Sequence, residues 1–228
     1  MILRKWEQLP EWLRNESTKQ YYDILMRKRF DLFFKRVFDF IVAMVLLILL
    51  SPVLLITAIL VKVTSKGPVL YKQERITTYG KKFKIFKFRT MIENADKLGT
   101  LVTLDNDSRV TKVGRFLRKL RLDEVPQLFN VLLGQMSFVG TRPEVQKYVE
   151  AYSEDMLATL LMPAGITSLA CINFRDEEKC LDNRQSVEDV YINKILPDKM
   201  RYNLEYIERF NVFYDVKLMF DTVLAVLK

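Results

Sequence analysis

The apolar stretch FIVAMVLLILLSPVLLITAILV, from Phe40 to Val61, contains 22 residues and no charged side chain. As an α-helix it is about 33 Å long, enough to cross the hydrocarbon core of a bilayer. The stretch is too long, and too far along the chain, to be typical of a cleavable signal peptide. It therefore predicts a membrane-embedded segment.

Ser51 and Pro52 lie at the midpoint of this stretch. Pro52 has no N–H to donate to the carbonyl of Ile48, and its ring presses on the preceding turn, so a kink is expected. The Ser51 hydroxyl can satisfy a carbonyl that the kink frees, which makes the break tolerable in lipid. Ser51 and Pro52 are therefore the predicted kink residues.

Basic residues flank the apolar stretch on both sides. They are Arg27, Lys28, Arg29, Lys35 and Arg36 before it, and Lys62, Lys66, Lys72 and Arg75 after it. Because the positive-inside rule places such residues on the cytoplasmic side, a bent helix that enters and leaves by the same face satisfies both flanks. A kinked single span is the alternative, and the residues alone favour neither.

The composition limits the partners and the kinds of catalysis that are possible for this chain. The 228 residues suit one domain of ordinary size plus an appendage, and the net charge of +8 points to an anionic partner such as nucleic acid, phospholipid headgroups or a phosphorylated substrate. The absence of histidine excludes Ser-His-Asp and Cys-His catalysis and histidine-ligated metals. Cys171 and Cys180 are predicted to be free thiols in a reducing cytoplasm.

The periodicity predicts an α+β protein, mostly helical with a small sheet. Residues 1–34 form an amphipathic extension that either lies at the membrane interface or packs on the rest of the chain. The C-terminal tail, 212–228, is expected to be a helix in the core or at the interface. The other predicted elements are strands at 69–71 and 83–88, helices at 91–98, 110–121, 126–133, 144–161, 186–195 and 197–210, a turn at 163–165, and a possible strand at 169–174.

The segment KKFKIFKFRTM, residues 81–91, interleaves basic and aromatic side chains. This pattern is typical of single-stranded nucleic-acid binding, where bases stack on rings. A cationic strand at a headgroup surface has the same pattern. The membrane segment only 20 residues upstream favours the lipid interpretation.

An acidic pair, Asp123 and Glu124, lies in RKLRLDEVPQLFN between a basic amphipathic helix and the start of the next helix. Most such pairs are solvated surface residues, but a helix terminus and nearby arginines attract phosphate. Two carboxylates repel an anionic substrate unless a divalent cation or arginines intervene. The pair therefore suits a magnesium phosphate site, with Asp123 and Glu124 as metal ligands.

The segment SFVGTRPE, residues 137–144, is the second candidate. Gly140 permits a tight loop, and Arg142 offers a fork for phosphate oxygens. An ordinary surface loop with a solvated arginine is the alternative.

From Lys35 to its C-terminus the chain resembles the small monotopic phosphoglycosyl transferases, the bacterial sugar transferase family. The resemblance covers about 190 of the 228 residues. The matching segments are KRVFDF at 35–40, the Ser51-Pro52 break, GPVLYKQER at 67–75, FKIFKFRTM at 83–91, DSRVTKVGRFLRKLRLDEVPQLFNVLLGQMSFVG at 107–140, RPE at 142–144 and PAGIT at 163–167.

The resemblance implies that Asp123 attacks the β-phosphate of a UDP-sugar and releases UMP, and that polyprenyl (undecaprenyl) phosphate then takes the phosphosugar from the aspartate. It implies that Glu124 holds Mg²⁺ or orients the nucleophile, that Arg118 and Arg142 bind phosphates, and that Arg142 and Pro143 frame the nucleotide site. This reaction is the first membrane step of bacterial surface glycan assembly.

The resemblance also implies a monotopic architecture at the cytoplasmic face of the bacterial inner membrane, with membrane lipid and no nucleic acid as partners. Residues 35–62 would be a re-entrant membrane helix with interfacial amphipathic helices around it, and residues 63–228 a cytoplasmic catalytic domain. A non-catalytic membrane-anchored binding or scaffolding protein is the alternative.

The chain departs from the family pattern at two places. Thr141 stands where the family usually has the first proline of Gly-Pro-Arg-Pro, and the loss of that proline is expected to loosen the loop. After Gly165 the sequence ITSLACINFRDEE differs from the common version. The sugar that is transferred therefore cannot be predicted from the resemblance.

Overall fold

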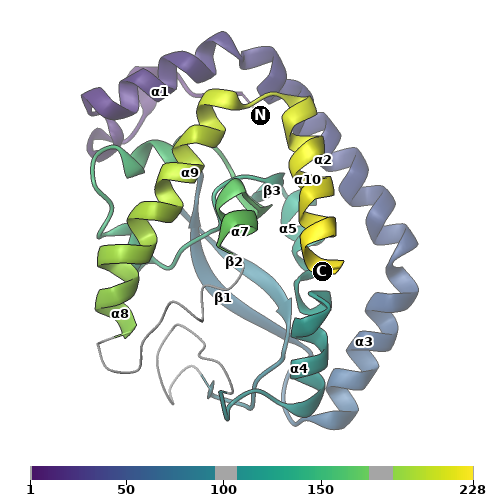
Figure 1. The fold of residues 1–228 in the computed structure, drawn as a ribbon. Helices are drawn as coiled ribbons and strands as arrows, with labels where there is room; N and C mark the ends of the chain where they lie inside the picture. Colours follow the sequence, from purple (N-terminus) through teal and green to yellow (C-terminus); the bar gives the residue numbers. More distant parts are fainter. Residues whose placement is uncertain (1, 96–106, 175–186, 228) are drawn as a thin grey trace.

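The computed structural model describes residues 2–95, 107–174 and 187–227. The fold is α+β and mostly helical, with two small two-stranded sheets near its centre, as the sequence predicts (Figure 1). One main hydrophobic core joins the N-terminal segment, both sheets and the C-terminal helices. The membrane placement of this fold stays a prediction.

The apolar stretch forms two helices, α2 (Arg29–Leu49) and α3 (Ser51–Thr64), which are bent by 63° at their junction. The Ser51 hydroxyl donates to the Ile48 carbonyl at 2.8 Å, so the predicted kink and its compensation are both confirmed. No single described helix is long and apolar enough to cross a bilayer, whereas the bent pair together has the length and composition. The pair runs along one side of the molecule (Figure 1).

A buried polar network fastens α2 to the C-terminal helix α10 (Val212–Leu227). The Lys35 ammonium lies 2.6 Å from Oδ2 of Asp215 and donates to the carbonyl of Val139 at 2.8 Å. Tyr206 donates to the other Asp215 oxygen at 2.7 Å. Because every member is buried, this network fixes how α2 lies on the core.

Helix α10 confirms the helix predicted for the C-terminal tail and its contact with the core, whereas its placement at the membrane interface stays a prediction. Its inner face, with Leu218 and Asp215, is buried in the core. Phe213, Phe220 and Val223 on the same helix are exposed. The helix is therefore amphipathic and leaves an apolar face uncovered.

Strands β1 (Leu70–Thr77) and β2 (Lys81–Phe88) pair antiparallel around a short turn at Thr78–Gly80. Both strands are predicted, although β1 is longer than expected. Phe83 and Phe88 on β2 are buried. These rings are not available to stack on bases, so the packing argues against the nucleic-acid interpretation.

Strands β3 (Met136–Val139) and β4 (Ala164–Thr167) pair in parallel and form the second sheet. The sequence analysis missed β3 and assigned the start of β4 to a turn. All four residues of β3 are buried. A strand this short, covered on both faces, shows no alternation that periodicity could detect.

Three predicted elements are wrong. The helix predicted at 144–161 is two short pieces, α6 (Gln146–Val149) and η6 (Met156–Leu161), because the chain turns between them. The possible strand at 169–174 is helix α7 (Leu169–Asn173), which the Ser168 side chain caps by accepting from the Cys171 amide. Of the helix predicted at 91–98, residues 91–94 are not helical and Ala95 is 3₁₀-helical, while 96–98 lie outside the described residues, as does Cys180. Cys171 is a free thiol, as predicted.

The remaining helices follow the sequence. The predicted basic helix is α4 (Lys112–Lys119), capped by Thr111, and the next is α5 (Gln127–Leu132), which ends at Gly134 with φ +75°. The helices predicted at 186–195 and 197–210 are joined, since α8 (Val187–Val190) continues through a π-helical segment (Tyr191–Ile195) into α9 (Leu196–Arg209).

The N-terminal residues pack against the rest of the chain, as the alternative to interfacial placement predicts. They form two short 3₁₀ turns (Trp6–Gln8 and Glu11–Leu13) and helix α1 (Glu16–Arg27). Leu13 and Leu25 are fully buried in the main core. The domain boundaries at 34 and 62 stay predictions.

Candidate functional site

The acidic pair lies on a short 3₁₀ turn, Leu122–Glu124, between α4 and α5. Arg121, with φ +55°, ends α4 in the left-handed region and turns the chain inward. Asp123 and Glu124 are consequently only 7% and 8% exposed. The interpretation of this pair as solvated surface residues is therefore wrong.

Glu124 is the centre of a cationic cluster. Its Oε1 lies 2.6 Å from Arg142, 2.9 Å from Lys87 and 3.9 Å from Arg121. Burial opposes ionisation, but Arg142 and Lys87 together hold the pKa of Glu124 well below its usual range. Glu124 is therefore a permanent anion whose first role is to position two cations.

The pKa of Asp123 is shifted in the opposite direction. Its Oδ1 is buried and accepts no hydrogen bond from any described residue. Burial, and then the charge of Glu124, raise the pKa of Asp123, while Lys87 and Arg118 oppose the rise. A buried carboxylate oxygen that lacks a hydrogen-bond partner costs free energy, so the site favours a ligand that supplies such a partner.

The loop that carries Arg142 is fixed where β3 and β4 end. The Gly140 amide donates to Thr167 at 3.0 Å, and the Gly165 amide donates to the Thr141 carbonyl at 2.9 Å. A Cβ on Gly140 would clash with the carbonyl oxygen of Pro163, well inside the 3.0 Å that real Cβ atoms keep. Gly140 is thus needed because β3 and β4 approach closely, and not because a turn requires a positive φ. The backbone at Thr141 is held by its hydrogen bond from the Gly165 amide.

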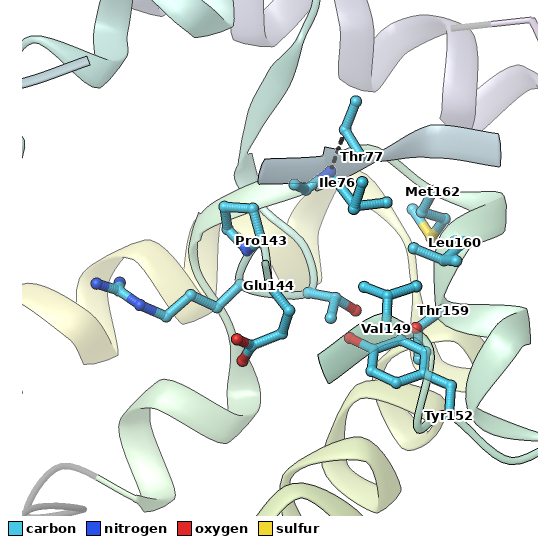
Figure 2. Close-up of a pocket in the computed structure, with 12 residues that line it drawn as sticks. Ile76, Thr77, Pro143, Glu144, Val149, Tyr152, Thr159, Leu160 and Met162 are labelled. Carbon is cyan, nitrogen blue, oxygen red and sulfur yellow. Dashed lines mark hydrogen bonds between the residues drawn. The ribbon is translucent and has the colours of Figure 1, made fainter. Parts of the chain in front are cut away.

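Arg142 and Pro143 both lie at the site that the sequence predicts for them. The charge of Glu124 raises the pKa of Arg142 well above its usual range. The Pro143 carbonyl accepts from Arg75 on β1 at 3.2 Å. A small pocket is lined by residues 141–144 together with the end of β1 and Tyr152 (Figure 2).

Glu144, the next residue, holds this loop in place through its side chain and its backbone carbonyl. It is buried and accepts from the Tyr191 hydroxyl at 2.5 Å, and the Lys199 ammonium lies 3.6 Å from it. Its backbone carbonyl also accepts from the Ile76 amide at 3.0 Å. The loop is therefore held by β1 on one side and by the α8–α9 helix on the other.

Arg118 lies on α4, the helix that precedes the acidic pair. Its Nε donates to the Thr90 hydroxyl at 2.9 Å, and its charge lowers the pKa of Asp123, although burial and Glu124 dominate that pKa and raise it. A Cβ on Gly114 would clash with the Thr90 carbonyl oxygen, so α4 sits directly on the segment after β2. Of the predicted substrate-binding residues, the structure thus brings Arg118 and Arg142 to the acidic pair.

Lys87 is a site residue that the sequence analysis missed. Burial lowers the pKa of its ammonium group, against the attraction of Glu124. On β2 the residues Phe83, Ile85 and Lys87 share one face, and the first two are buried core residues. The period-2 alternation of the strand therefore marks Lys87 as inward-facing, whereas Lys82 and Lys84 face solvent.

The metal-binding capacity of the site is limited to two carboxylates. In the described part of the chain no three His, Cys, Asp or Glu side chains form a cluster that could hold a metal ion. Mg²⁺ nevertheless commonly binds one or two carboxylates together with substrate phosphates. The unpartnered Oδ1 of Asp123 and the adjacent Glu124 fit that pattern.

The chain is similar to several known proteins. A family model described as bacterial sugar transferase matches residues 30–228. A Klebsiella pneumoniae protein named UDP-glucose:undecaprenyl-phosphate glucose-1-phosphate transferase is 43% identical over 174 residues, which are 74% of this chain and 34% of that protein. An Aeromonas hydrophila UDP-N-acetylgalactosamine-undecaprenyl-phosphate N-acetylgalactosaminephosphotransferase is 35% identical over 175 residues, 75% of this chain and 38% of that protein.

A shorter relative matches over most of its length. A Bacillus subtilis protein named uncharacterized sugar transferase EpsL is 37% identical over 171 residues, 75% of this chain and 76% of that protein. The chain therefore spans only about a third of the first two relatives but most of the third. The extent of the family match, from the start of the bent helix pair to the last residue, shows that the chain belongs to the bacterial sugar transferase family.

Proposed function

We propose that this protein transfers a sugar-1-phosphate from a UDP-sugar to polyprenyl phosphate, with Asp123 as the nucleophile. The names of the two longer relatives specify undecaprenyl phosphate as acceptor, and one names UDP-glucose as donor. The observation that carries the proposal is the buried, unpartnered Oδ1 of Asp123 beside cations held by Glu124.

The proposed reaction has two displacements at one phosphorus atom. A carboxylate oxygen of Asp123 attacks the β-phosphorus of the donor, and the bond from that phosphorus to the bridging oxygen breaks. The electron pair leaves with UMP, which gives an aspartyl phosphosugar. An oxygen of polyprenyl phosphate then attacks the same phosphorus and expels the Asp123 carboxylate, yielding the polyprenyl diphosphate sugar.

The cations around Asp123 account for the charge in this scheme. Arg142 and Lys87 lie within 3.0 Å of Glu124, and the charge of Arg118 acts on Asp123. These three cations would counter the negative charge of a bound diphosphate. Such preorganised donors stabilise developing negative charge. Mg²⁺ bound by Asp123 and Glu124 would neutralise the donor phosphates and so reduce their repulsion of the nucleophile.

We also propose that the bent α2–α3 pair is a re-entrant membrane segment at the cytoplasmic face of the inner membrane. Many of its apolar side chains are exposed, and further exposed apolar side chains lie on or next to α4, α5 and α10: Phe116, Leu120, Phe129, Phe213, Phe220 and Val223. Exposed apolar surface of this extent marks a membrane or protein interface. The acceptor phosphate lies at headgroup depth, so the nucleophile must work at that boundary.

The central experiment measures UMP release by the purified full-length protein with a panel of UDP-sugars, undecaprenyl phosphate and Mg²⁺. Asp123→Asn should reduce UMP release to the background rate, while Asp155→Asn, at an exposed acidic position, should retain it. With donor alone, mass spectrometry should detect a phosphosugar adduct on the Asp123 peptide. A fully active Asp123→Asn variant rules out the proposed nucleophile.

The membrane arrangement is tested separately by labelling peptide tags at both ends of the chain with an impermeant reagent. A re-entrant segment leaves both tags protected in intact cells and accessible after lysis. An N-terminal tag that reacts in intact cells indicates a single span and contradicts the re-entrant arrangement.

A further inference from the structure

A second cavity lies apart from the acidic site. It has a volume of about 400 Å³ and lies between the first turns of α2, the β1–β2 turn and the α5–β3 connection. This size is within the range of small-molecule sites. Its lining includes Thr78, Lys81, Lys82, Arg36 and Leu133.

The lining carries an excess of positive charge. Arg36, Lys81 and Lys82 face a single uncompensated lining carboxylate, Asp39, since the remaining lining lysine, Lys35, is neutralised by Asp215. Lys82 lies 3.0 Å from Glu74, whereas Lys81 makes no ion pair with any described residue. The cavity therefore favours an anionic ligand, and Lys81 is the lining cation that is available to pair with it.

Arg36 is held in a fixed position in the cavity lining. Its guanidinium donates to the carbonyls of Val131 and Leu132 at 2.7 and 2.9 Å, at the end of α5. On α2, Phe33 precedes it by three residues and Phe40 follows it by four, so both lie on its helical face, and both are exposed. Leu133, which lines the cavity, is also exposed.

A ligand that suits this site has an anionic head and an apolar body. The head meets Lys81, Lys82 and Arg36, and the body lies along Leu133 and the exposed face of α2. We infer that this cavity binds the phosphate headgroup of an anionic phospholipid, whose acyl chains lie against Leu133 and α2. The inference rests on the membrane placement under the proposed function.

The bound lipid would not be the acceptor of the reaction. Lys82 and Lys87 are five residues apart on β2, which corresponds to about 17 Å along a strand. Lys87 is the residue that contacts Glu124 at the acidic site. A headgroup phosphate in the cavity therefore lies too far from Asp123 to react, and the lipid instead fixes how the protein is seated on the membrane.

The test compares Lys81→Glu with Lys84→Glu in the full-length protein. Both lysines are exposed and lie on β2, and both substitutions change the net charge equally, but only Lys81 lines the cavity. Binding is measured by flotation with phosphatidylcholine vesicles, with and without phosphatidylglycerol. Lys81→Glu should lose roughly tenfold in its preference for the anionic vesicles, and Lys84→Glu should stay within about twofold of the wild type.

Native mass spectrometry gives a second measurement. The wild type and Lys84→Glu should retain one phosphatidylglycerol after extraction, and Lys81→Glu should retain none. Equal losses in the two variants indicate general electrostatic attraction and overturn the inference. UMP release in detergent micelles should be unchanged in Lys81→Glu, and its loss would equally contradict a site separate from catalysis.

The outcomes also separate this inference from the proposed function. A wild-type protein that binds neither kind of vesicle contradicts the membrane placement itself. A protein that binds both kinds equally well and releases UMP retains its proposed function, and only the lipid site is then excluded.

Discussion

The guanidinium of Arg142 donates to Oε1 of Glu124 at 2.6 Å and so joins the loop after β3 to the turn before α5. Because Glu124 is buried and ionised, it fixes the direction in which Arg142 points toward the space beside Asp123. The arginine therefore has two tasks under the proposed function, to satisfy Glu124 and to bind a donor phosphate.

We predict that Arg142→Lys, which retains the charge but loses the planar fork, lowers kcat/KM for UMP release by about 100-fold. Arg121→Lys is the matched control, because Arg121 is 3.9 Å from Glu124 and its side chain is half exposed. It should change kcat/KM by less than about threefold. If both variants behave alike, Arg142 contributes only charge and not geometry.

Lys87→Met should move the pH dependence of the first half-reaction. The ammonium of Lys87 lowers the pKa of Asp123, which burial and Glu124 raise. Removing it raises that pKa further, so the acid limb of UMP release from donor alone should shift to higher pH. Lys84→Met, on the solvent side of the same strand, should leave the limb in place. An unchanged limb in Lys87→Met would show that Asp123 is not the group that titrates.

Asp123→Asn should stabilise the protein near neutral pH while it abolishes activity. The pKa of Asp123 is raised in the folded state, chiefly by burial, so its ionisation favours the unfolded chain once the pH exceeds the ordinary value of about 3.9. The amide avoids this cost, and thermal unfolding at pH 7 should show a gain of about 1 kcal/mol. The gain should vanish as the pH falls below the ordinary pKa, and a gain that persists there would have another origin.

Much of the site could be predicted because its residues are close together in the chain or in a repeating pattern. Pro52 predicts the bend from its missing N–H, and Asp123 and Glu124 are adjacent in a short segment between two helices. Lys87 could also have been found, since alternation along β2 places it beside Ile85. In each case the structural feature depends on residues that are close to one another in the sequence.

The pairing of Glu124 with Arg142 could not be predicted in the same way. It depends on the parallel pairing of β3 with β4, and β3 is a fully buried four-residue strand without a visible period. The same tertiary packing also divides the predicted helix 144–161, since Glu144 and Tyr148 are held by the α8–α9 helix. Contacts between distant segments overrode the local helical pattern there.

Gly140→Ala should damage the site through the backbone. The added Cβ would clash with the Pro163 carbonyl oxygen, a contact that requires β3 and β4 to separate. We expect a loss of about 2 kcal/mol in the free energy of unfolding, and a lower kcat/KM because Arg142 is displaced. Thr141→Ala is the control on the same loop, since its backbone contact to Gly165 is retained. Urea unfolding and UMP release measure the two effects, and a Gly140→Ala variant as stable as Thr141→Ala contradicts the tight approach.

The buried pair of Lys35 and Asp215 links the proposed membrane helix to the catalytic loop, because Lys35 also donates to the carbonyl of Val139, next to Gly140. Lys35→Met leaves a carboxylate buried without its cation and should cost about 3–5 kcal/mol of stability. Lys35→Met combined with Asp215→Leu removes both charges and should recover a large part of that loss. A double-mutant cycle in detergent, followed by thermal unfolding, measures the coupling.

If the pair only stabilises the fold, the double variant regains UMP release together with stability. If the pair positions the loop, stability returns while kcat/KM for UMP release stays low. Additive losses in the cycle would mean that Lys35 and Asp215 do not act as a pair.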